Sequence, residues 1–521
     1  MVIVQTVLAL MAACIALAII ARIAGLPYAV VLILGGSMVA FIPGLPGITL
    51  DPELALAFFL PPLLQASAYR TDWRAFRLSI RPILLLALGC VVFTSFFIGA
   101  VARVLMPDLP WAAAIALGAI LAPPDAVAAA AVLARLNLPR SIVTVLEGES
   151  LVNDASALVI YRVAVAAMAA GSFVPAEAVG SFLLVGIGGI AVGWLVGRAT
   201  LWVTVRLRDT LLETALSFIA AYASFLSAEA LHLSGVMGVV TCGIMLGQAQ
   251  YRFSARTRLE SRAVWDFIEF VLTSLIFILI GLQLNEILGR LDGRGAWELT
   301  GLAVAVSVAL VASRFFWVLP TVWLPGLLVS RWRGQPAPPF AQAVVLSWAG
   351  MRGVVSLAAA IALPLSFPER DLIIFLAFCA ILATLVLQGT TLEWVIRRVD
   401  LVVPPHPDGI DPAEAHARHA AAKAALGAIE SRAADVLYGP IATDLLGEHR
   451  DRAAHLARVA AGGGAAAAER AARRAIRLEG IEAGRAAILA IHAEGRLAEE
   501  TLAKLAQELD LEENRMRHAL G

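Results

Sequence analysis

The chain has 521 residues, of which 60% are hydrophobic and 15% are charged, and its mean hydropathy is +0.83. This composition excludes an ordinary soluble domain and indicates a polytopic protein of the lipid bilayer. The formal net charge is +0, and no basic patch is interleaved with aromatic residues, so nucleic acid is not an expected partner.

A window of about 19 residues predicts about thirteen membrane spans before Val399. The first span lacks the basic region and cleavage site of a signal peptide, so we expect it to stay in the mature protein. The run from Glu213 to Gln250 could also be divided differently. The predicted spans begin near Ile3, Pro27, Glu53, Ile80, Pro110, Ile142, Ala178, Glu213, Leu233, Trp265, Leu299, Ala341 and Leu372.

Arginines in the loops between these spans predict the orientation. The loops after odd-numbered spans carry seventeen arginines, whereas those after even-numbered spans carry four, namely Arg103, Arg290, Arg294 and Arg370. Cytoplasmic loops carry the excess of positive charge. We therefore expect a multi-pass protein of the cytoplasmic (inner) membrane with its N-terminus outside and its C-terminus inside.

After Pro404-Pro405 the composition changes to Ala, Arg, Glu and His with helical spacing, which predicts a helical cytoplasmic tail over 401–521. A linker-like AGGGAAAA interrupts the tail around Gly462. Seven of the eight histidines fall in this region. No carboxylate network accompanies them, so we expect solvated helix faces rather than a pH sensor.

Two of the predicted spans contain a helix-breaking segment. The fifth span has Pro123-Pro124-Asp125 in its middle, and the twelfth has Gly350-Met351-Arg352-Gly353. Proline removes a backbone donor and glycine tolerates unwound backbone, so both helices should break. The two lie seven spans apart and run in opposite directions, as expected of fifth elements in two inverted repeats. Asp125 and Arg352 have the signs needed to oppose half-helix ends.

The sixth span begins LEGESLVNDASALVIY, Leu146 to Tyr161. Glu149 and Asn153 are one turn apart, as are Ser150 and Asp154, so all four can face one interior site. An ionised group at the bilayer centre costs roughly 2.5 to 3.5 kcal/mol on insertion scales, and it is by default a functional hypothesis. The span therefore predicts a functional carboxylate site.

Seven stretches of the chain, taken together and in this order, resemble the monovalent cation:proton antiporters, in particular the electroneutral sodium/proton exchanger branch and its bacterial members. They are LPYAVVLILGG, LDPELALAFFLPPLL, YRTDWRAFR, APPDAVAAAAVL, LEGESLVNDASALV, SRFFWV and WAGMRGVVSLAAAIALP. The resemblance covers about residues 1–400. It implies a homodimer in which a core (about 79–177 and 297–400), with two crossed, discontinuous helices, moves against a dimerisation part (about 1–78 and 178–290).

The resemblance also implies the ion-binding residues. Asp154 matches the essential carboxylate that binds either the cation or the proton, and Asn153 matches the neighbour that distinguishes electroneutral from electrogenic exchangers. Asp125 matches the acid of the family's Thr-Asp motif, and Ser150 matches a hydroxyl ligand of related transporters. The implied ligands of a metal cation, Na+, are thus Asp154, Asp125 and Ser150.

Two arginines and a glutamate look like the family's charged core residues, which form an ion pair and compensate helix dipoles. Glu149 resembles the glutamate that pairs with the arginine of the twelfth span, so we expect a buried pair between Glu149 and Arg352. Arg314 in SRFFWV looks like the other core arginine.

The chain departs from the family pattern twice. Pro124 stands where many relatives have Thr, so only its backbone carbonyl could serve the ion. The third span offers Gln65 and Ser67 where some relatives have an acid, so we expect its contribution to be uncharged.

Competition at one carboxylate is enough for exchange. Burial and a second acid both raise the proton affinity of a carboxylate, and hard cations prefer oxygen ligands. We expect a secondary active antiporter that exchanges Na+, or else Li+ or K+, for H+ without a cofactor. Exchange should be electroneutral and serve pH and sodium homeostasis.

Two other functions remain as alternatives. Asp125 and Asp154 on adjacent spans could belong to an intramembrane aspartyl protease, but a GxGD motif is missing and Arg352 would have no role. A cation channel with a regulatory tail would need a continuous pore rather than a site closed on one side. Because the protease reading is the less favoured one, we do not expect an enzyme.

The four cysteines show no disulfide or metal pattern.

Overall fold

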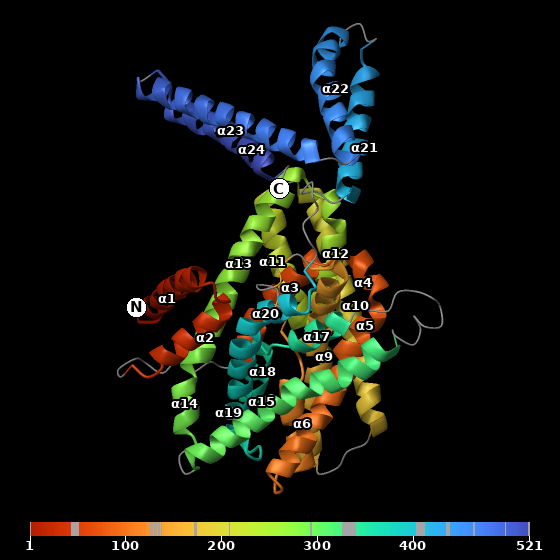
Figure 1. Ribbon diagram of the computed structural model, residues 1–521. Helices are drawn as coiled ribbons and strands as arrows, with labels where there is room; N and C mark the ends of the chain where they lie inside the picture. Colours follow the sequence, from red (N-terminus) through yellow and green to blue (C-terminus); the bar gives the residue numbers. More distant parts are fainter. Residues whose placement is uncertain are drawn as a thin grey trace. The chain divides into compact units, whose positions relative to one another are not determined.

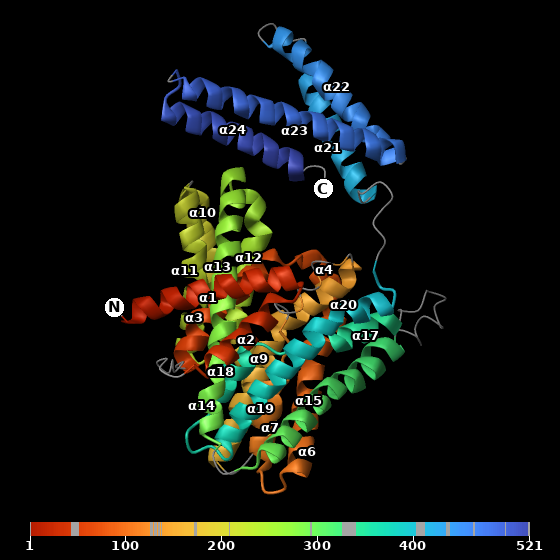
Figure 2. The ribbon, with the colours of Figure 1, turned by 60° about the vertical axis from the view of Figure 1, so that its left-hand side comes forward.

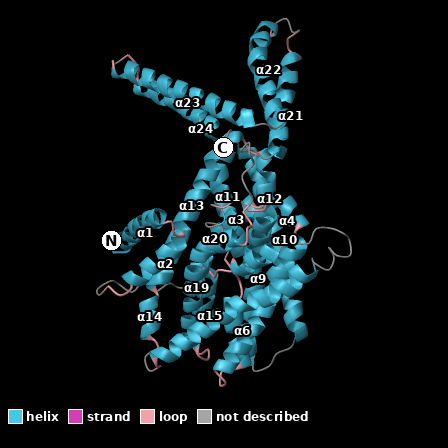
Figure 3. Ribbon diagram, in the orientation of Figure 1, coloured by secondary structure: helices cyan, strands magenta, loops and turns pink. Residues whose placement is uncertain are grey.

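The structure, a computed structural model, describes most of the chain and divides it into two compact units, Met1–Val403 and Pro404–Gly521. The predicted boundary at 400 and 401 lies within three residues of this division. Every regular element of the described residues is a helix (Figure 3), which confirms the predicted all-α class. The described residues are 2–42, 52–125, 129, 133, 136, 138–170, 175–207, 209–291, 294–325, 340–402, 412–433, 438–461, 464–494 and 496–518.

The first unit contains the predicted membrane region, and Figures 1 and 2 show its helices in chain order by colour. Its first part contains α1 (Val2–Ala24), α2 (Tyr28–Val39), α3 (Pro52–Arg70), α4 (Trp73–Leu78), α5 (Ile80–Leu84), α6 (Val91–Leu105), α7 (Trp111–Leu121) and α9 (Arg140–Ala170). Its second part contains α10 (Pro175–Leu207), α11 (Thr210–Ala230), α12 (Gly235–Ala249), α13 (Ala255–Leu282), α14 (Leu284–Gly289), α15 (Ala296–Val318), α17 (Phe340–Trp348), α18 (Val354–Ile361), α19 (Arg370–Ala383) and α20 (Gly389–Arg398).

Each of the predicted span starts falls inside one of these helices or within two residues of its beginning. The number of helices that cross the bilayer stays a prediction. Among the described residues, seven helical runs are long and apolar enough to cross: Ile80–Leu105, Arg140–Ala170, Gly180–Leu207, Thr210–Ala230, Ala255–Gly289, Ala296–Trp323 and Arg370–Arg398. The chain is a multi-pass membrane protein.

Close packing of α2 against α13 depends on two glycines. A Cβ added to Gly36 would overlap the carbonyl oxygen of Ile278, and one added to Gly281 would overlap that of Ile33. Small residues allow this backbone approach, which strengthens van der Waals packing where lipid gives no hydrophobic drive. Elsewhere α6 packs along α7, and α15 packs on α6 (Figure 2).

Wider π-helical turns interrupt three long helices. They are η1 (Leu85–Cys90) between α5 and α6, η3 (Leu319–Trp323) after α15, and η4 (Thr384–Gln388) between α19 and α20. Such turns leave carbonyls without their usual helical donors. In η1 the carbonyl of Ala87 accepts from Ser156 at 2.6 Å, and that of Leu85 accepts from Trp317 at 2.9 Å. Side chains of α9 and α15 thereby fix the first π turn.

The second unit is made of two helical hairpins. In one, α21 (Pro412–Glu430) packs against α22 (Gly439–Ala461), and in the other α23 (Gly464–Ala493) packs against α24 (Glu499–His518). The helical tail is thus confirmed. The core and dimerisation parts predicted for the first unit, and the inverted repeats, stay predictions.

Candidate functional site

Two unwound segments meet in the first unit. Helix α7 ends at Leu121, before Pro123-Pro124, and α17 and α18 are separated by Ala349–Gly353. The backbone N–H of Asp125 donates to the carbonyl of Met351 at 2.7 Å and joins the two segments. The predicted breaks are confirmed at both places. Most of the chain that follows Asp125, up to position 137, lies outside the described residues.

The amide of Asn153 fixes one unwound segment to α9. Its Nδ2 donates to the carbonyl of Pro124 at 2.7 Å, and the side chain is buried. Because this segment is unwound, the carbonyl of Pro124 accepts from a side chain of another helix instead of from its own helix. Asn153 therefore positions the break, and the predicted role of the Pro124 carbonyl toward the cation stays a prediction.

A cavity of about 370 Å³ lies beside the crossing and holds all three predicted cation ligands in its lining. They are the carboxylates of Asp125 and Asp154 and the hydroxyl of Ser150. Asp154 is 8% exposed. The cavity thus brings two carboxylates and a hydroxyl to one place, and oxygen atoms of these kinds are the ligands that hard cations prefer.

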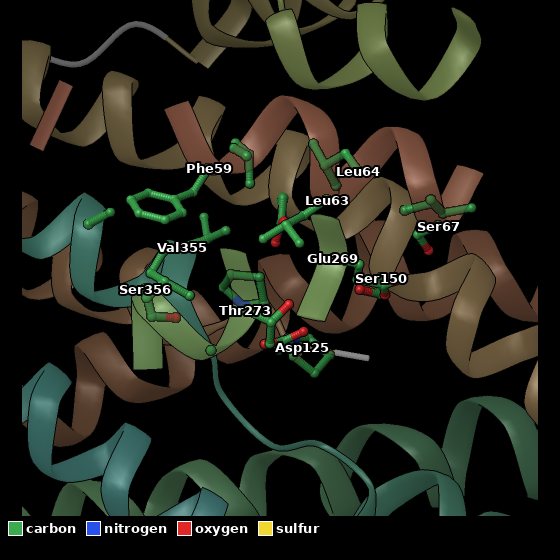
Figure 4. Close-up of a pocket in the computed structure, with 18 of the residues that line it drawn as sticks. Phe59, Leu63, Leu64, Ser67, Asp125, Ser150, Glu269, Thr273, Val355 and Ser356 are labelled. Carbon is green, nitrogen blue, oxygen red and sulfur yellow. The ribbon is translucent and has the colours of Figure 1, made fainter. Parts of the chain in front are cut away.

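Helices α3 and α13 supply the other wall of the cavity. Figure 4 shows Phe59, Leu63, Leu64 and Ser67 of α3 near Glu269 and Thr273 of α13. Apart from Ser67, Arg70, Glu269 and Thr273, the residues that α3 and α13 contribute to the lining are apolar.

Three further charged residues line this cavity and were not assigned to the site from the sequence: Arg70, Glu147 and Glu269. Arg70, at the end of α3, donates to Asp266 at 3.0 Å and also to Glu269. The expectation of an uncharged contribution from the third span is therefore wrong for Arg70, although Ser67 lines the cavity as expected. Glu269 stands between Ile268 and Phe270 on a long helix, where the sequence does not distinguish it from an interfacial charge.

Gln65, the other third-span candidate, faces a different helix. It is buried, and its Nε2 donates to the carbonyl of Ser217 in α11 at 3.0 Å. It does not belong to the residues that line the cavity. Gln65 thus links α3 to α11 instead of serving the site.

The buried ion pair of the core joins Glu149 to Arg314, so the predicted pair between Glu149 and Arg352 is wrong. Arg314 donates from Nη1 to Oε1 at 2.7 Å and from Nη2 to Oε2 at 2.6 Å. Both carboxylate oxygens are therefore occupied by one guanidinium. A third bond, from the Nε of Arg314 to the carbonyl of Leu346 at 2.8 Å, ties the pair to the end of α17.

Arg352 instead compensates the carboxyl-terminal ends of two half-helices. Its Nε donates to the carbonyl of Leu121, the last residue of α7, at 2.6 Å, and its Nη1 donates to Gly350, just after α17. Its backbone N–H donates to the hydroxyl of Thr384 at 3.1 Å. A helix carries partial negative charge at that end. The predicted dipole compensation by Arg352 agrees with these contacts.

Asp125 lies against the amino-terminal end of α18. A Cβ added to Gly353 would overlap the Oδ2 of Asp125, so the carboxylate occupies the space that a side chain would take there. Gly353, the residue that precedes α18, has no side chain that could cap the helix. Helix amino termini carry partial positive charge, and the Asp125 carboxylate opposes it. A positive side chain, Arg352, thus opposes the carboxyl-terminal half-helix ends, and a negative one, Asp125, opposes an amino-terminal end, as expected.

Comparisons with known proteins agree with this architecture. The family model for the transmembrane region of sodium/hydrogen exchangers matches residues 9–398. A Mycobacterium tuberculosis H37Rv protein named uncharacterized Na(+)/H(+) exchanger is 35% identical over 505 residues, covering 93% of this chain and 91% of the relative. A sodium, potassium, lithium and rubidium/H(+) antiporter of Bacillus pumilus is 33% identical over 382 residues, or 70% of this chain and 57% of that protein.

A solved structure shows the same fold. The sodium proton antiporter MjNhaP1 from Methanocaldococcus jannaschii superposes with a TM-score of 0.60 at 18% identity, covering 76% of this chain and 98% of that one. At this identity the likeness shows the fold alone. The family match and the sequence relatives show more, and from them it follows that the chain belongs to the sodium/hydrogen exchanger family.

Proposed function

We propose that the protein is a secondary active antiporter that exchanges Na+ for H+ across the cytoplasmic membrane, one for one. The observation that carries this proposal is the placement of Asp154, Asp125 and Ser150 around one cavity at the crossing of two broken helices. A buried carboxylate can hold a proton or a cation, and each excludes the other. Family membership and the names of the relatives support exchange as the function.

We assign the exchanged proton to Asp154. Glu149 is neutralised by Arg314, Asn153 is neutral, and Asp125 opposes the amino-terminal end of α18. Among these residues of the crossing, Asp154 is left as the carboxylate whose charge can change during the cycle. One cation or one proton per cycle gives electroneutral exchange.

Further parts of the proposal concern the whole protein. We propose a homodimer in which α3 and α13 belong to the static part, and the cavity wall formed by α9 and α18 moves against them. The N-terminus lies outside and the C-terminus in the cytoplasm, and exchange serves pH and sodium homeostasis. No bound cofactor is needed for this cycle.

The test is proton flux in proteoliposomes that contain the purified protein and a gradient of Na+, Li+ or K+. Asp154→Asn should insert normally and lose exchange, whereas Asp108→Asn, at an exposed loop carboxylate, should keep it. Retention of more than about a tenth of the wild-type flux in Asp154→Asn would refute the assignment, because an amide at position 154 cannot take up the exchanged proton.

The same preparation separates the alternatives. Cleavage of a membrane peptide without cation-dependent proton flux would indicate a protease. Cation conductance that does not saturate and moves no protons would indicate a channel.

A further inference from the structure

Ser356 lines the same cavity as Asp125 and Asp154 but belongs to the other broken helix. It is the third residue of α18, counted from Val354, and it is 1% exposed. Its hydroxyl has no hydrogen-bond partner among the residues that the structure describes. A buried hydroxyl without a partner is unfavourable by about 1 to 3 kcal/mol, so its position needs an explanation.

The start of α18 at Val354 removes one local partner that this hydroxyl could otherwise use. Several buried serine and threonine side chains of this protein donate to the carbonyl four residues earlier, as Ser95 does to Val91 at 2.7 Å and Ser347 to Ala343 at 2.8 Å. This local bond is the usual way to satisfy such a hydroxyl inside a helix. For Ser356 the residue four positions earlier is Arg352, which precedes the helix. The break thus leaves the hydroxyl available to the cavity.

The surroundings of this hydroxyl favour a cation over an apolar occupant. In the view of Figure 4, Asp125 lies between Ser356 and Ser150, and all three line the cavity. Pro124, next to Asp125, has no hydroxyl to offer. The cavity that Asp125 lines thus receives one serine side chain from α9, Ser150, and one from α18, Ser356.

We propose that the hydroxyl of Ser356 is a ligand of the transported alkali cation, together with Asp154, Asp125 and Ser150. This inference rests on the proposed function. Ser356 supplies a neutral oxygen, so it stabilises a cation that has lost water without changing the charge of the cycle. Ser356 belongs to α18 and Asp125 to the segment that follows α7, so the ligand set includes residues of both broken helices. Ser356 thereby contributes to cation affinity and selectivity, and not to proton binding.

The test compares Ser356→Ala with a matched control, Ser274→Ala. Ser274 on α13 is also buried and also has no hydrogen-bond partner among the described residues, but it does not line the cavity. Flux in proteoliposomes gives KM for Na+, Li+ and K+ at fixed pH. Thermal unfolding of the purified protein in NaCl or choline chloride gives Na+ binding independently of transport.

Ser356→Ala should raise KM for Na+ about fivefold to tenfold, the size expected for one lost polar contact, with maximal velocity within about twofold of wild type. Its stabilisation by NaCl should fall, and the ratio of the KM values for Li+ and Na+ should change. Ser356→Thr, which keeps a hydroxyl, should restore KM. Ser274→Ala should leave KM for Na+, maximal velocity, the stabilisation by NaCl and the ratio of the KM values unchanged.

Unchanged KM and unchanged stabilisation by NaCl in Ser356→Ala would overturn the inference, as would equal effects in Ser274→Ala. Should Ser356→Ala not fold, Ser356→Cys decides in its place, because a thiol is a poor ligand for a hard cation and must also raise KM. A wild type without cation-dependent proton flux would overturn the proposed function instead. In that case, the Na+-dependent melting temperatures still decide whether Ser356 is a ligand.

Discussion

Arg314 donates one hydrogen bond to each carboxylate oxygen of Glu149, at 2.7 and 2.6 Å, and neither side chain is more than 2% exposed. The two charges are out of reach of solvent, so each depends on the other. Removing one partner of such a pair leaves an uncompensated buried charge, which is unfavourable by about 3 to 5 kcal/mol.

Glu149→Gln and Arg314→Gln should each lower the apparent melting temperature in detergent strongly. The double variant should lose much less than the sum of the two, since neither charge is then left alone. Glu393→Gln, at the exposed pair with Arg397 (2.8 Å), is the control, and an exposed helical pair contributes only about 0.3 to 0.5 kcal/mol. Additive losses in the double variant would contradict the pairing.

Arg352→Lys should reduce exchange by about tenfold or more, because a hydrogen bond from a charged donor contributes about 1.5 to 3 kcal/mol. An ammonium group lacks the planar fork that reaches the carbonyls of Leu121 and Gly350 together. Arg397→Lys, at an exposed position, should leave the rate unchanged. Flux in proteoliposomes and melting temperature are measured together, and wild-type flux in Arg352→Lys would show that charge alone is sufficient.

Gly353→Ala should abolish or strongly reduce exchange, because the new methyl group would overlap the carboxylate of Asp125 and displace it. Gly301→Ala on α15 is a suitable control, since a Cβ there meets no atom within 4 Å. Both variants should insert and run as folded protein in size-exclusion chromatography. If Gly353→Ala keeps the wild-type KM and rate, the exact position of the Asp125 carboxylate does not matter for the cation.

Exchange should not respond to membrane potential. A potential exerts about 2.3 kcal/mol per elementary charge per 100 mV, so one net charge per cycle would shift the equilibrium measurably. Potassium-valinomycin potentials of either sign, imposed on proteoliposomes with Na+ as substrate, should leave the reversal gradient of proton flux unchanged. A reversal point that moves with voltage would require a second titrating group, with Asp125 as the first candidate.

Asn153→Asp extends this test to the neighbouring position. The amide donates to the Pro124 carbonyl at 2.7 Å, and an aspartate could do so only while protonated. The variant should therefore lose stability as the pH rises, and any exchange that it retains should depend on voltage. A melting temperature that matches wild type at every pH would show that the bond to Pro124 is dispensable.

The sequence predicts the breaks of this fold more reliably than the partners of the residues around them. Pro123-Pro124 and the glycines flanking Arg352 act on their own backbone, so their effect is local and can be derived from residue type. Whether Arg314 or Arg352 pairs with Glu149 depends on two features of the folded protein. One is which carbonyls the breaks leave for Arg352, and the other is how α15 places Arg314 beside Glu149. Those are tertiary facts that neither charge nor spacing contains.

The role of Ser356 is a second feature that the sequence does not predict. Ser356 lies in VVSLAAAI, where an isolated serine is indistinguishable from a serine that bonds to its own helix. The exact start of α18 decides that Arg352, four residues earlier, lies outside the helix. Glu147, by contrast, could have been included in the site, since it stands three residues before Ser150 and seven before Asp154, a spacing that puts all three on one helix face.

The bond from the N–H of Asp125 to the carbonyl of Met351 is made entirely by main-chain atoms. Its strength does not depend on which side chains the two residues carry. This link between the two broken helices therefore does not require an acid at position 125, and it separates the joining of the helices from the chemistry of the carboxylate. For the same reason Asp125→Asn keeps this main-chain bond and removes the charge that opposes the amino-terminal end of α18, so it is an experimental probe of that charge.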